Sequence, residues 1–307
     1  MRVLVTGGAG FIGSYVSDML INNGHEVIVI DNLSSGKEEN VNPEVLLFKE
    51  DIRDSDIGKI IEKEKPEAVI HHAAQANVRK SVEDPFYDMD VNIVGTLNLL
   101  KYSVKYGVKK IIFASTGGAV YGEQKRFPAD ETHPTNPLCP YGITKLTCEK
   151  YLYYYYKTYG LNYVSLRYSN VYGPRQDPRG EAGVVAIFSQ KMLFGDQPYI
   201  NGSGEQTRDY VFVEDVARAN VLILEKDVLG EFNIGTGIET TVNSLFKELK
   251  TLAGSKIEPV YKEAKKGEQF RSVLDWSKAK REFGWKPEVS LKDGLKETVT
   301  FLQNRLD

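Results

Sequence analysis

The chain opens with Met1-Arg2-Val3-Leu4-Val5-Thr6-Gly7-Gly8-Ala9-Gly10-Phe11-Ile12-Gly13, a short apolar run that leads directly into closely spaced glycines. The run predicts a buried strand over residues 2–6, and a helical pattern begins at Phe11. The glycines show two overlapping spacings, Gly7-x-x-Gly10-x-x-Gly13 and Gly8-x-Gly10-x-x-Gly13. Glycines in such a turn permit a tight bend and close backbone approach, so that a pyrophosphate can rest on the N–H groups at the helix N-terminus. The stretch therefore predicts a dinucleotide-binding fold.

An acidic residue at the end of the second predicted strand strengthens this prediction. Asp31 lies about twenty residues beyond the glycines and directly follows a β-branched run at 26–30. A carboxylate there accepts hydrogen bonds from the adenosine ribose and would repel a 2′-phosphate, which favours NAD over NADP. A glycine turn alone is weak evidence, but together with Asp31 it predicts an NAD site.

The rest of the first half alternates β-branched runs with helical patterns, which is typical of βαβ units and a parallel sheet. We predict an α/β protein with a Rossmann-type doubly wound parallel sheet. Residues 1–170 would form the NAD-binding domain and 171–307 a smaller substrate-binding part, with some segments returning to the sheet. Strands are predicted at 2–6, 26–30, 68–72, 110–115 and 163–167, with a weaker candidate at 45–48. Helices are predicted at 11–23, 54–64, 85–106, 141–159, 214–224, 242–252, 277–283 and 291–302.

Composition excludes several classes of protein. The chain is 41% hydrophobic and 26% charged, and no stretch approaches the roughly eighteen apolar residues of a membrane span. Its 42 acidic and 39 basic residues are well mixed, which argues against a nucleic-acid partner. The apolar run begins at Val3 without a leader, and only two cysteines, Cys139 and Cys148, occur. We therefore expect a cytoplasmic protein with no membrane partner, and no metal site.

Further cofactor contacts are expected beyond the carboxyl ends of the other strands, where ligands of such sheets bind. Asp51-Ile52 follows the weak strand candidate, and the Asp could meet the adenine amino group. His72-Ala73-Ala74-Gln75 follows the next strand, with small residues where a backbone must pass close to the cofactor. For His71 and His72 we favour strand-end histidines satisfied by neighbours over a role in proton transfer.

The candidate chemistry lies in Tyr141-Gly142-Ile143-Thr144-Lys145, which places a phenol and an ammonium at i and i+4 on one helical face. Tyrosine is a poor base at neutral pH because its pKa is about 10, but a nearby Lys⁺ favours the phenolate. The phenolate could remove a hydroxyl proton while NAD takes the hydride from the same carbon. A surface pair is the simpler explanation of this spacing in isolation, but the preceding dinucleotide pattern favours the catalytic one.

Several motifs together resemble the extended short-chain dehydrogenase/reductase family, and within it the subfamily of UDP-glucose (UDP-galactose) 4-epimerases. They span essentially the whole chain: Gly7 to Gly13, Asp31-Asn32-Leu33-Ser34-Ser35-Gly36, Asn92, Val120-Tyr121-Gly122, Tyr141 to Lys145 and Arg167-Tyr168-Ser169-Asn170. The resemblance implies that Tyr141 is the acid/base and that Lys145 holds the nicotinamide ribose. With the residues above, the predicted cofactor set is Gly7, Gly10, Phe11, Ile12, Gly13, Asp31, Asn32, Ser34, Ser35, Gly36, Asp51, Ile52, His72, Ala73, Ala74, Gln75, Asn92, Tyr141, Lys145 and Tyr168.

One catalytic position departs from the family pattern. Counting back from Tyr121, the usual Ser or Thr that holds the substrate hydroxyl is replaced by Gly117. We expect Thr116, or less favourably Ser115, to take its place; the alternative is that water or the phenol alone aligns the hydroxyl. The 4,6-dehydratases of this family carry an Asp-Glu pair at Gly117-Gly118, so dehydration lacks its acid and base here.

The same resemblance implies a UDP-sugar substrate. Two arginines suit a diphosphate because guanidinium gives bidentate, permanently charged contacts, and they lie in Arg208-Asp209-Tyr210 and Gly267-Glu268-x-x-Arg271-Ser272. Ser272 occupies a position where bulk limits the sugar 2-substituent, so a small Ser suggests room for an N-acetyl group. The predicted substrate residues are Asn170, Val184, Val185, Tyr199, Asn201, Arg208, Arg271 and Ser272.

The resulting hypothesis is a 4-epimerase in which Tyr141 takes the 4-hydroxyl proton, hydride passes from C4 to NAD, and the 4-keto sugar turns before hydride returns to its other face. The alternatives are a nucleotide-sugar decarboxylase or reductase, and a non-catalytic NAD sensor, for which the pair Tyr141 and Lys145 would have no use. The preferred sugar and UDP versus dTDP stay open. A homodimer is expected, with helices 85–106 and 141–159 paired as a four-helix bundle.

Overall fold

The computed structural model describes residues 1–178, 183–264 and 269–305. Its centre is a seven-stranded sheet in the order β11-β6-β5-β4-β1-β2-β3, and every neighbouring pair is parallel. The predicted α/β doubly wound fold is confirmed. The strands are β1 (Arg2–Thr6), β2 (Glu26–Ile30), β3 (Leu46–Phe48), β4 (Ala68–His71), β5 (Lys110–Thr116), β6 (Asn162–Tyr168) and β11 (Gly230–Ile234).

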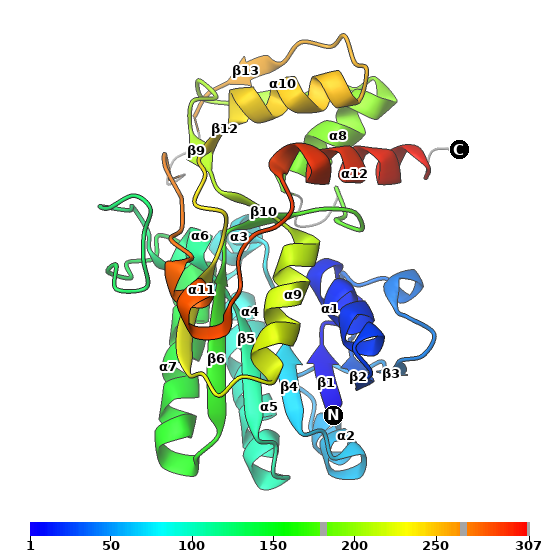
Figure 1. The fold of residues 1–307 in the computed structure, drawn as a ribbon, viewed down its shortest axis with the longest axis vertical. Coiled ribbons are helices and arrows are strands. Elements are labelled where there is room, and N and C mark those ends of the chain that lie inside the picture. Colours follow the sequence, from blue (N-terminus) through cyan, green and yellow to red (C-terminus); the bar gives the residue numbers. More distant parts are fainter. Residues whose placement is uncertain (179–182, 265–268, 306–307) are drawn as a thin grey trace.

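Helices cover both faces of this sheet (Figure 1). One face packs against α1 (Phe11–Asn22), α9 (Val213–Leu224) and α11 (Ser277–Phe283), and the other packs against α2 (Asp56–Glu64), α5 (Gly95–Lys105) and α7 (Pro140–Tyr159). Successive strand side chains point to opposite faces, so Val3 and Val5 join the first cluster while Leu4 joins the second. Burial on both faces explains why the strands read as continuous apolar runs.

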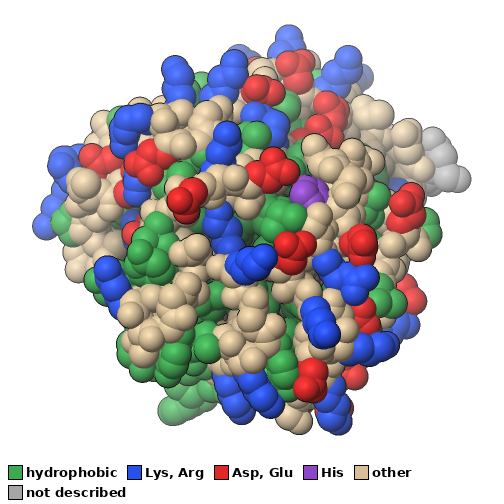
Figure 2. All heavy atoms as spheres, turned by 60° about the horizontal axis from the view of Figure 1, so that its bottom comes forward, with side chains coloured by type: hydrophobic (Ala, Val, Ile, Leu, Met, Phe, Trp, Pro, Cys, Tyr) green, Lys and Arg blue, Asp and Glu red, His purple; other side chains and the backbone are tan. Residues whose placement is uncertain are grey.

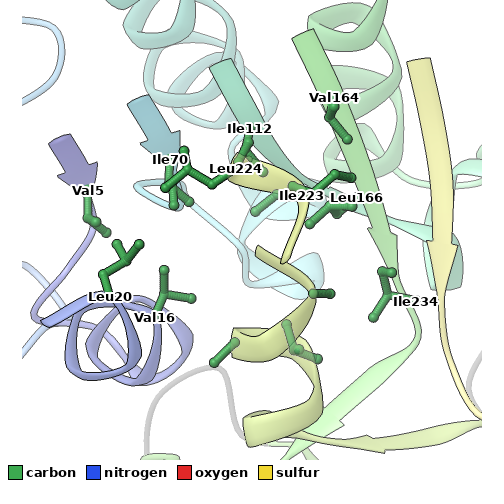
Figure 3. Packing of buried hydrophobic residues seen from close by; sticks show 14 of the residues in the cluster. Val5, Val16, Leu20, Ile70, Ile112, Val164, Leu166, Ile223, Leu224 and Ile234 are labelled. Carbon is green, nitrogen blue, oxygen red and sulfur yellow. The ribbon is translucent and has the colours of Figure 1, made fainter. Parts of the chain in front are cut away.

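Figure 3 shows the first of these clusters from close by, with Val5, Ile70, Ile112 and Val164 of four strands facing Val16 and Leu20 of α1 and Ile223 and Leu224 of α9. The cluster joins distant parts of the chain, because α9 lies in the second half of the sequence and packs beside α1. One face of the sheet is therefore covered in part by a helix from beyond residue 170.

The predicted helix 85–106 is present but is not uniform. It consists of α4 (Pro85–Met89), a π-helical turn η2 (Asp90–Val94) and α5, and it is preceded by α3 (Val78–Glu83), which was not predicted. Asn77 and Asp84 cap α3 and α4 with their side chains. A π turn re-aims side chains within a helix, and this one carries Asn92.

The remaining elements gather beyond the carboxyl ends of the strands, at the top of Figure 1. Three small two-stranded sheets pair β7 with β10, β8 with β13 and β9 with β12. Helices α8, α10 and α12 share one apolar cluster with β7 and β10. These elements are α6 (Gly117–Val120), β7 (Asn170–Tyr172), α8 (Val184–Phe194), β8 (Tyr199–Asn201), β9 (Thr207–Arg208), β10 (Tyr210–Phe212), β12 (Thr240–Thr241), α10 (Val242–Leu252), β13 (Val260–Lys262) and α12 (Leu291–Gln303), with a 3₁₀ turn η1 (Glu38–Asn40) beside the sheet.

Strand β11 and helix α8 were missed by the sequence analysis. β11 begins with Gly230-Glu231 and lies at the edge of the sheet beside β6, so it lacks the long apolar run of a central strand. Helix α8 is apolar nearly all round, and its pattern does not show the one-sided period of a surface helix.

The face at the amino ends of the strands is mixed in charge. Figure 2 shows Lys and Arg side chains interspersed with Asp and Glu over the end of the molecule that is lowest in Figure 1. The distribution on this face agrees with the nearly balanced composition of the chain. None of the helices in the described ranges combines the length and apolar character that crossing a bilayer requires.

Candidate functional site

An open cavity lies at the carboxyl edge of the sheet, where β1, β2, β4, β5 and β6 end. It brings together nearly all of the predicted cofactor residues, from the glycine turn to the first residues of α7. The cavity is also lined by residues that were not predicted: Ile30, Glu50, Ala76, Val91 and Ala114. Its predicted lining residues are Gly7, Gly10, Phe11, Ile12, Gly13, Asp31, Asn32, Ser34, Ser35, Gly36, Asp51, Ile52, His72, Ala73, Ala74, Ser115, Tyr141, Lys145 and Tyr168.

The glycine turn, here called the glycine cradle, packs so closely on neighbouring backbone that side chains at Gly7 and Gly13 would not fit. Gly7 has φ +72°, and a Cβ there would stand 2.6 Å from the backbone nitrogen of Ala73. A Cβ on Gly13 would stand 2.2 Å from the carbonyl oxygen of Gly7. Gly10 is the N-cap residue of α1 and has no side chain to cap it, so the first N–H groups of the helix have no side-chain acceptor from that position. The turn therefore fits the pyrophosphate of a dinucleotide, which those N–H groups and the helix dipole would bind.

Two carboxylates, those of Asp31 and Asp51, line the cavity. Asp31 follows β2 and accepts hydrogen bonds from the backbone N–H groups of Ala9, at 2.9 Å, and Leu33, at 2.8 Å, while its burial raises its pKa. Asp51 accepts two hydrogen bonds from the Arg53 guanidinium, both at 2.8 Å, and these lower its pKa to about 2. Asn32 also donates to Asp51, at 2.7 Å. The predicted ribose and adenine contacts thus lie side by side.

Tyr141 and Lys145 lie on the first turns of α7, which begins with Pro140 at a position where its missing N–H costs no hydrogen bond. Lys145 is 3% exposed, and its ammonium donates to the carbonyl oxygen of Ala114 at 2.8 Å and lies 5.9 Å from the centre of the Tyr141 ring. A buried cation beside a phenol stabilises the phenolate more strongly than one in water would. The geometry that the spacing predicted is present.

Both strand-end histidines have partners. His71 contacts the hydroxyls of Thr6 at 2.6 Å and Thr96 at 3.0 Å, and His72 contacts the Tyr168 hydroxyl at 3.1 Å. Burial, and secondarily the Lys145 charge, lowers the pKa of His72 to about 3 and lowers that of His71. The neutral, fully partnered His71 agrees with the structural role favoured from the sequence, whereas His72 is satisfied only at Nε2, because its buried Nδ1 has no hydrogen-bond partner.

The two candidates for the assisting hydroxyl, Ser115 and Thr116, are placed differently, and Gly117 is closely packed. The Ser115 hydroxyl donates to Glu149 at 2.6 Å, which directs it to the buried ion pair between Glu149 and Arg167. A Cβ on Gly117 would stand 2.4 Å from the Leu274 side chain, so this position cannot carry the family's hydroxyl without a shift of Leu274. The Thr116 hydroxyl is not among the cavity-lining groups, but it lies 3.9 Å from the place where a Gly118 Cβ would stand.

Gln75 and Asn92 lie behind the cavity wall. Asn92 accepts from the backbone N–H of Gln75 and donates to its carbonyl oxygen, both at 2.9 Å, so the π turn holds the residues that follow β4. The Gln75 side chain donates to Asp88 at 2.8 Å, and Asp88 also accepts from Thr144 of α7 at 2.8 Å. Their polar groups join the segment after β4 to α7, a role that a strand-end position does not reveal.

The predicted substrate residues lie on the elements above the sheet edge. Asn170 opens β7, Val184 and Val185 form the first turn of α8, and Tyr199 and Asn201 lie in β8. Lys262 of β13 lies over the Tyr199 ring, 3.6 Å from its centre. Ser272 is buried. The motif residues Gly267 and Glu268 lie outside the described ranges.

Arg208 and Arg271 come from adjacent segments, because Thr207 of β9 donates its backbone N–H to the carbonyl of Phe270 at 2.9 Å. Arg208 donates to the Thr207 carbonyl at 2.7 Å. Arg271 forms a bidentate pair with Glu239, at 2.9 and 2.7 Å, and its guanidinium lies 3.7 Å from the centre of the Phe127 ring. Glu239 was not predicted, since no sequence pattern connects it to Arg271.

Asp209 is a second residue of this site that was not predicted from the sequence, although it lies inside the motif Arg208-Asp209-Tyr210. It is 1% exposed and accepts from the backbone N–H groups of Thr236, Gly237 and Leu274, at 2.9 to 3.2 Å. It therefore pins the turn after β11 and the segment next to Ser272, which positions the arginines on either side. The only sequence feature that could have drawn attention to Asp209 is its position between Arg208 and Tyr210.

A doubly wound parallel sheet with a glycine cradle, an acidic residue after β2, and a Tyr and Lys on one helix at its carboxyl edge defines the short-chain dehydrogenase/reductase class. Within it, the family model of the NAD dependent epimerase/dehydratase family matches residues 3–235, and the chain belongs to that family. The family's cofactor is the one that Asp31 and the glycine turn predicted.

Solved and curated relatives extend the similarity to the whole chain. The crystal structure of UDP-glucose 4-epimerase with UDP-glucose from Thermotoga maritima is 55% identical, covers 100% of both chains and has a TM-score of 0.98. The Thermus thermophilus UDP-glucose 4-epimerase, in complex with NAD, is 45% identical over 99% of both chains with a TM-score of 0.93. The UDP-glucose 4-epimerase of Mycolicibacterium smegmatis is 44% identical and covers 99% of each sequence.

Proposed function

We propose that this protein catalyses the NAD-dependent 4-epimerisation of a UDP-hexose, interconverting UDP-glucose and UDP-galactose. The observation that carries the proposal is the buried Lys145 ammonium beside the Tyr141 ring, at the rim of a cavity whose glycine cradle fits a dinucleotide. Full-length similarity to UDP-glucose 4-epimerases supports the choice of reaction and substrate.

The roles of the chain's own groups follow from their positions. NAD, when bound, supplies a hydride acceptor and donor at the carbon that changes configuration. Gly7, Gly13 and the α1 N-terminus would hold its pyrophosphate and Asp31 its ribose. The Tyr141 phenolate would take the proton of the sugar hydroxyl and return it after the 4-keto sugar has turned, and the Lys145 charge would keep the phenolate available.

Thr116 is the assisting hydroxyl in this proposal. The Ser115 hydroxyl is held by Glu149, whereas the hydroxyl of Thr116 and the side-chain oxygen of Asn170 lie within 4.0 Å of the place where a Gly118 Cβ would stand. Glycine at that position leaves room beside two polar groups. The sugar hydroxyl would be aligned there.

The nucleotide would be anchored by charge and the sugar held by few contacts. Arg208 and Arg271 are the proposed diphosphate ligands, with Asn170, Val184, Val185, Tyr199 and Asn201 around the nucleotide. Tight contacts on the diphosphate and loose contacts on the sugar allow the 4-keto intermediate to turn about its linkage. The small, buried Ser272 would leave room for an N-acetyl group.

We propose that the protein forms a homodimer through α4 and α7, which pack against each other within one chain. Large hydrophobic side chains on these helices are exposed: Phe86 is 78% exposed, Ile143 51% and Tyr154 49%. Two copies would bury these side chains in a four-helix arrangement. Analytical ultracentrifugation should then give twice the chain mass for wild type and a lighter species for Phe86→Asp.

The deciding experiment is proton NMR of UDP-galactose incubated with purified protein and no added cofactor, followed for the signal of the C4 epimer. UDP-N-acetylglucosamine is tested separately to rank the sugars, with Ser272→Tyr as the comparison for the 2-substituent. Tyr141→Phe should reduce the rate roughly 10²- to 10⁴-fold, as expected for loss of acid–base catalysis. Absence of any epimer after NAD is supplied would refute the proposed reaction.

A further inference from the structure

Residues 173–178, which follow β7 and are here named the strap, lie against the cofactor side of the molecule. Arg175 reaches across to α1, where Nη1 donates to the Asp18 carboxylate at 2.7 Å and to the Ser14 hydroxyl at 3.2 Å. Its guanidinium lies 4.6 Å from the centre of the Tyr15 ring. A side chain from the second half of the chain is thus fixed on the helix whose N-terminus forms the glycine cradle.

The backbone of the strap supports a specific function for these contacts. Arg175 has φ +68°, in the left-handed region that side chains other than glycine rarely adopt. Such a conformation persists only where surrounding contacts compensate for it. The three partners on α1 supply that compensation, and the left-handed residue aims the guanidinium at them.

A second set of contacts connects the strap to the loop of residues 31–42, which lines the cavity with Asp31, Asn32 and Ser34 to Gly36. The Asp177 carboxylate lies 3.4 Å from the Lys37 ammonium. The backbone N–H of Lys37 donates to the carbonyl of Ala9 at 2.9 Å, beside the cradle. Asn42, from the same loop, donates to Asp18 at 3.2 Å. Asp18 therefore joins the loop, α1 and the strap.

We propose that the strap is a clasp that retains the dinucleotide, with Arg175 and Asp177 as positioning residues. They hold the loop of residues 31–42 against the cradle, so that widening this side of the cavity requires these contacts to break. The inference rests on the proposed function in one respect, namely that the cavity binds NAD. A cofactor that is restored within every catalytic cycle has no need to leave, and slow release keeps the enzyme active at low NAD.

The two ion pairs should contribute unequally. The side chains of Arg175 and Asp18 are 27% and 26% exposed, and Arg175 has further contacts with Ser14 and Tyr15. Those of Lys37 and Asp177 are 43% and 35% exposed and are screened more strongly by solvent. Loss of the Arg175 contacts should therefore accelerate NAD release more than loss of the Lys37 contact.

The test measures NAD release directly. NAD-loaded protein is diluted into an excess of a second dehydrogenase with its own alcohol substrate, so that freed NAD is converted to NADH and followed by absorbance. We expect release to accelerate about tenfold in Arg175→Met and about threefold in Lys37→Asp, the latter reversed in Lys37→Asp/Asp177→Lys. Lys59→Met, which removes an exposed ion pair to Asp56 on α2, is the matched control and should release NAD at the wild-type rate.

Release from Arg175→Met at the wild-type rate, with an unchanged melting temperature, would overturn the clasp. If that variant melts at a lower temperature, the charge reversal decides, because a double variant that releases NAD as fast as Lys37→Asp contradicts a specific pairing. The proposed reaction fails separately: protein that retains NAD but forms no C4 epimer refutes the epimerase, whereas the release rates still test the clasp.

Discussion

The hydroxyls of Ser115 and Thr116 differ in what they can do, although they are neighbours in β5. Ser115 donates to Glu149 inside the core, and Thr116 lies near Asn170 at the sheet edge. We expect Thr116→Val to lower kcat roughly 10- to 100-fold, the effect of one hydrogen bond to a group that becomes charged. Ser115→Ala should leave kcat within about twofold and cost about 1 kcal/mol of stability. The reverse ranking in steady-state kinetics would assign the role to Ser115.

Gly117 explains at the residue scale why this chain departs from its family's pattern. Its missing side chain accommodates Leu274, which would meet a Cβ at 2.4 Å. Gly117→Ser should therefore destabilise the protein by about 1–3 kcal/mol in urea unfolding, as overpacked cores do. Gly117→Ser/Leu274→Ala should recover part of that loss. If the double variant is less stable than the sum of the two single effects, packing against Leu274 is not the cause.

At the scale of elements, the buried pair of Glu149 and Arg167 joins α7 to β6. The two side chains are 0% and 5% exposed and meet at 2.6 Å, while Arg167 also donates to the hydroxyl of Tyr121 at 3.0 Å. Glu149→Gln leaves the guanidinium without its counter-charge, and we expect a loss of about 3–5 kcal/mol in the free energy of unfolding. Glu149→Gln/Arg167→Met removes both charges and should be more stable than Glu149→Gln alone. Chemical denaturation of wild type, Glu149→Gln, Arg167→Met and the double variant measures the coupling, and additive losses of the two single variants would contradict it.

At the scale of the whole molecule, the buried histidine of β4 couples folding to pH. The pKa of His71 is lowered by burial and by the Lys145 charge, so the unfolded chain binds a proton that the folded one does not. Stability from this group is present above its unfolded pKa, about 6.5, and is lost as the pH falls below it, by about 1.4 kcal/mol per pH unit. We expect urea midpoints to fall between about pH 6.5 and 5, and to fall less steeply in His71→Gln. Equal slopes would place the titration elsewhere.

Several features of this protein could be predicted from local sequence patterns alone. The glycine turn, Asp31, and the Tyr141 and Lys145 pair were predictable because each function depends on residues within one turn or one helical face. The strands β1, β2 and β4 to β6 were predictable because burial on both faces makes them apolar throughout. The sequence by itself thus determined the fold class, the cofactor and the placement of Tyr141 and Lys145 on one face of α7.

Tertiary structure decided what depends on contacts between distant segments. The sequence could not show that the Ser115 hydroxyl donates to Glu149, or that Leu274 fills the space at Gly117. It also could not show that Glu239 binds Arg271, or that Arg175 reaches α1. Edge strand β11 and its contact with β6 likewise lack a local signature. The physical reason is that periodicity and turn chemistry report a residue's own helix or strand, whereas hydrogen-bond partners and packing neighbours are set only when the chain brings remote segments together.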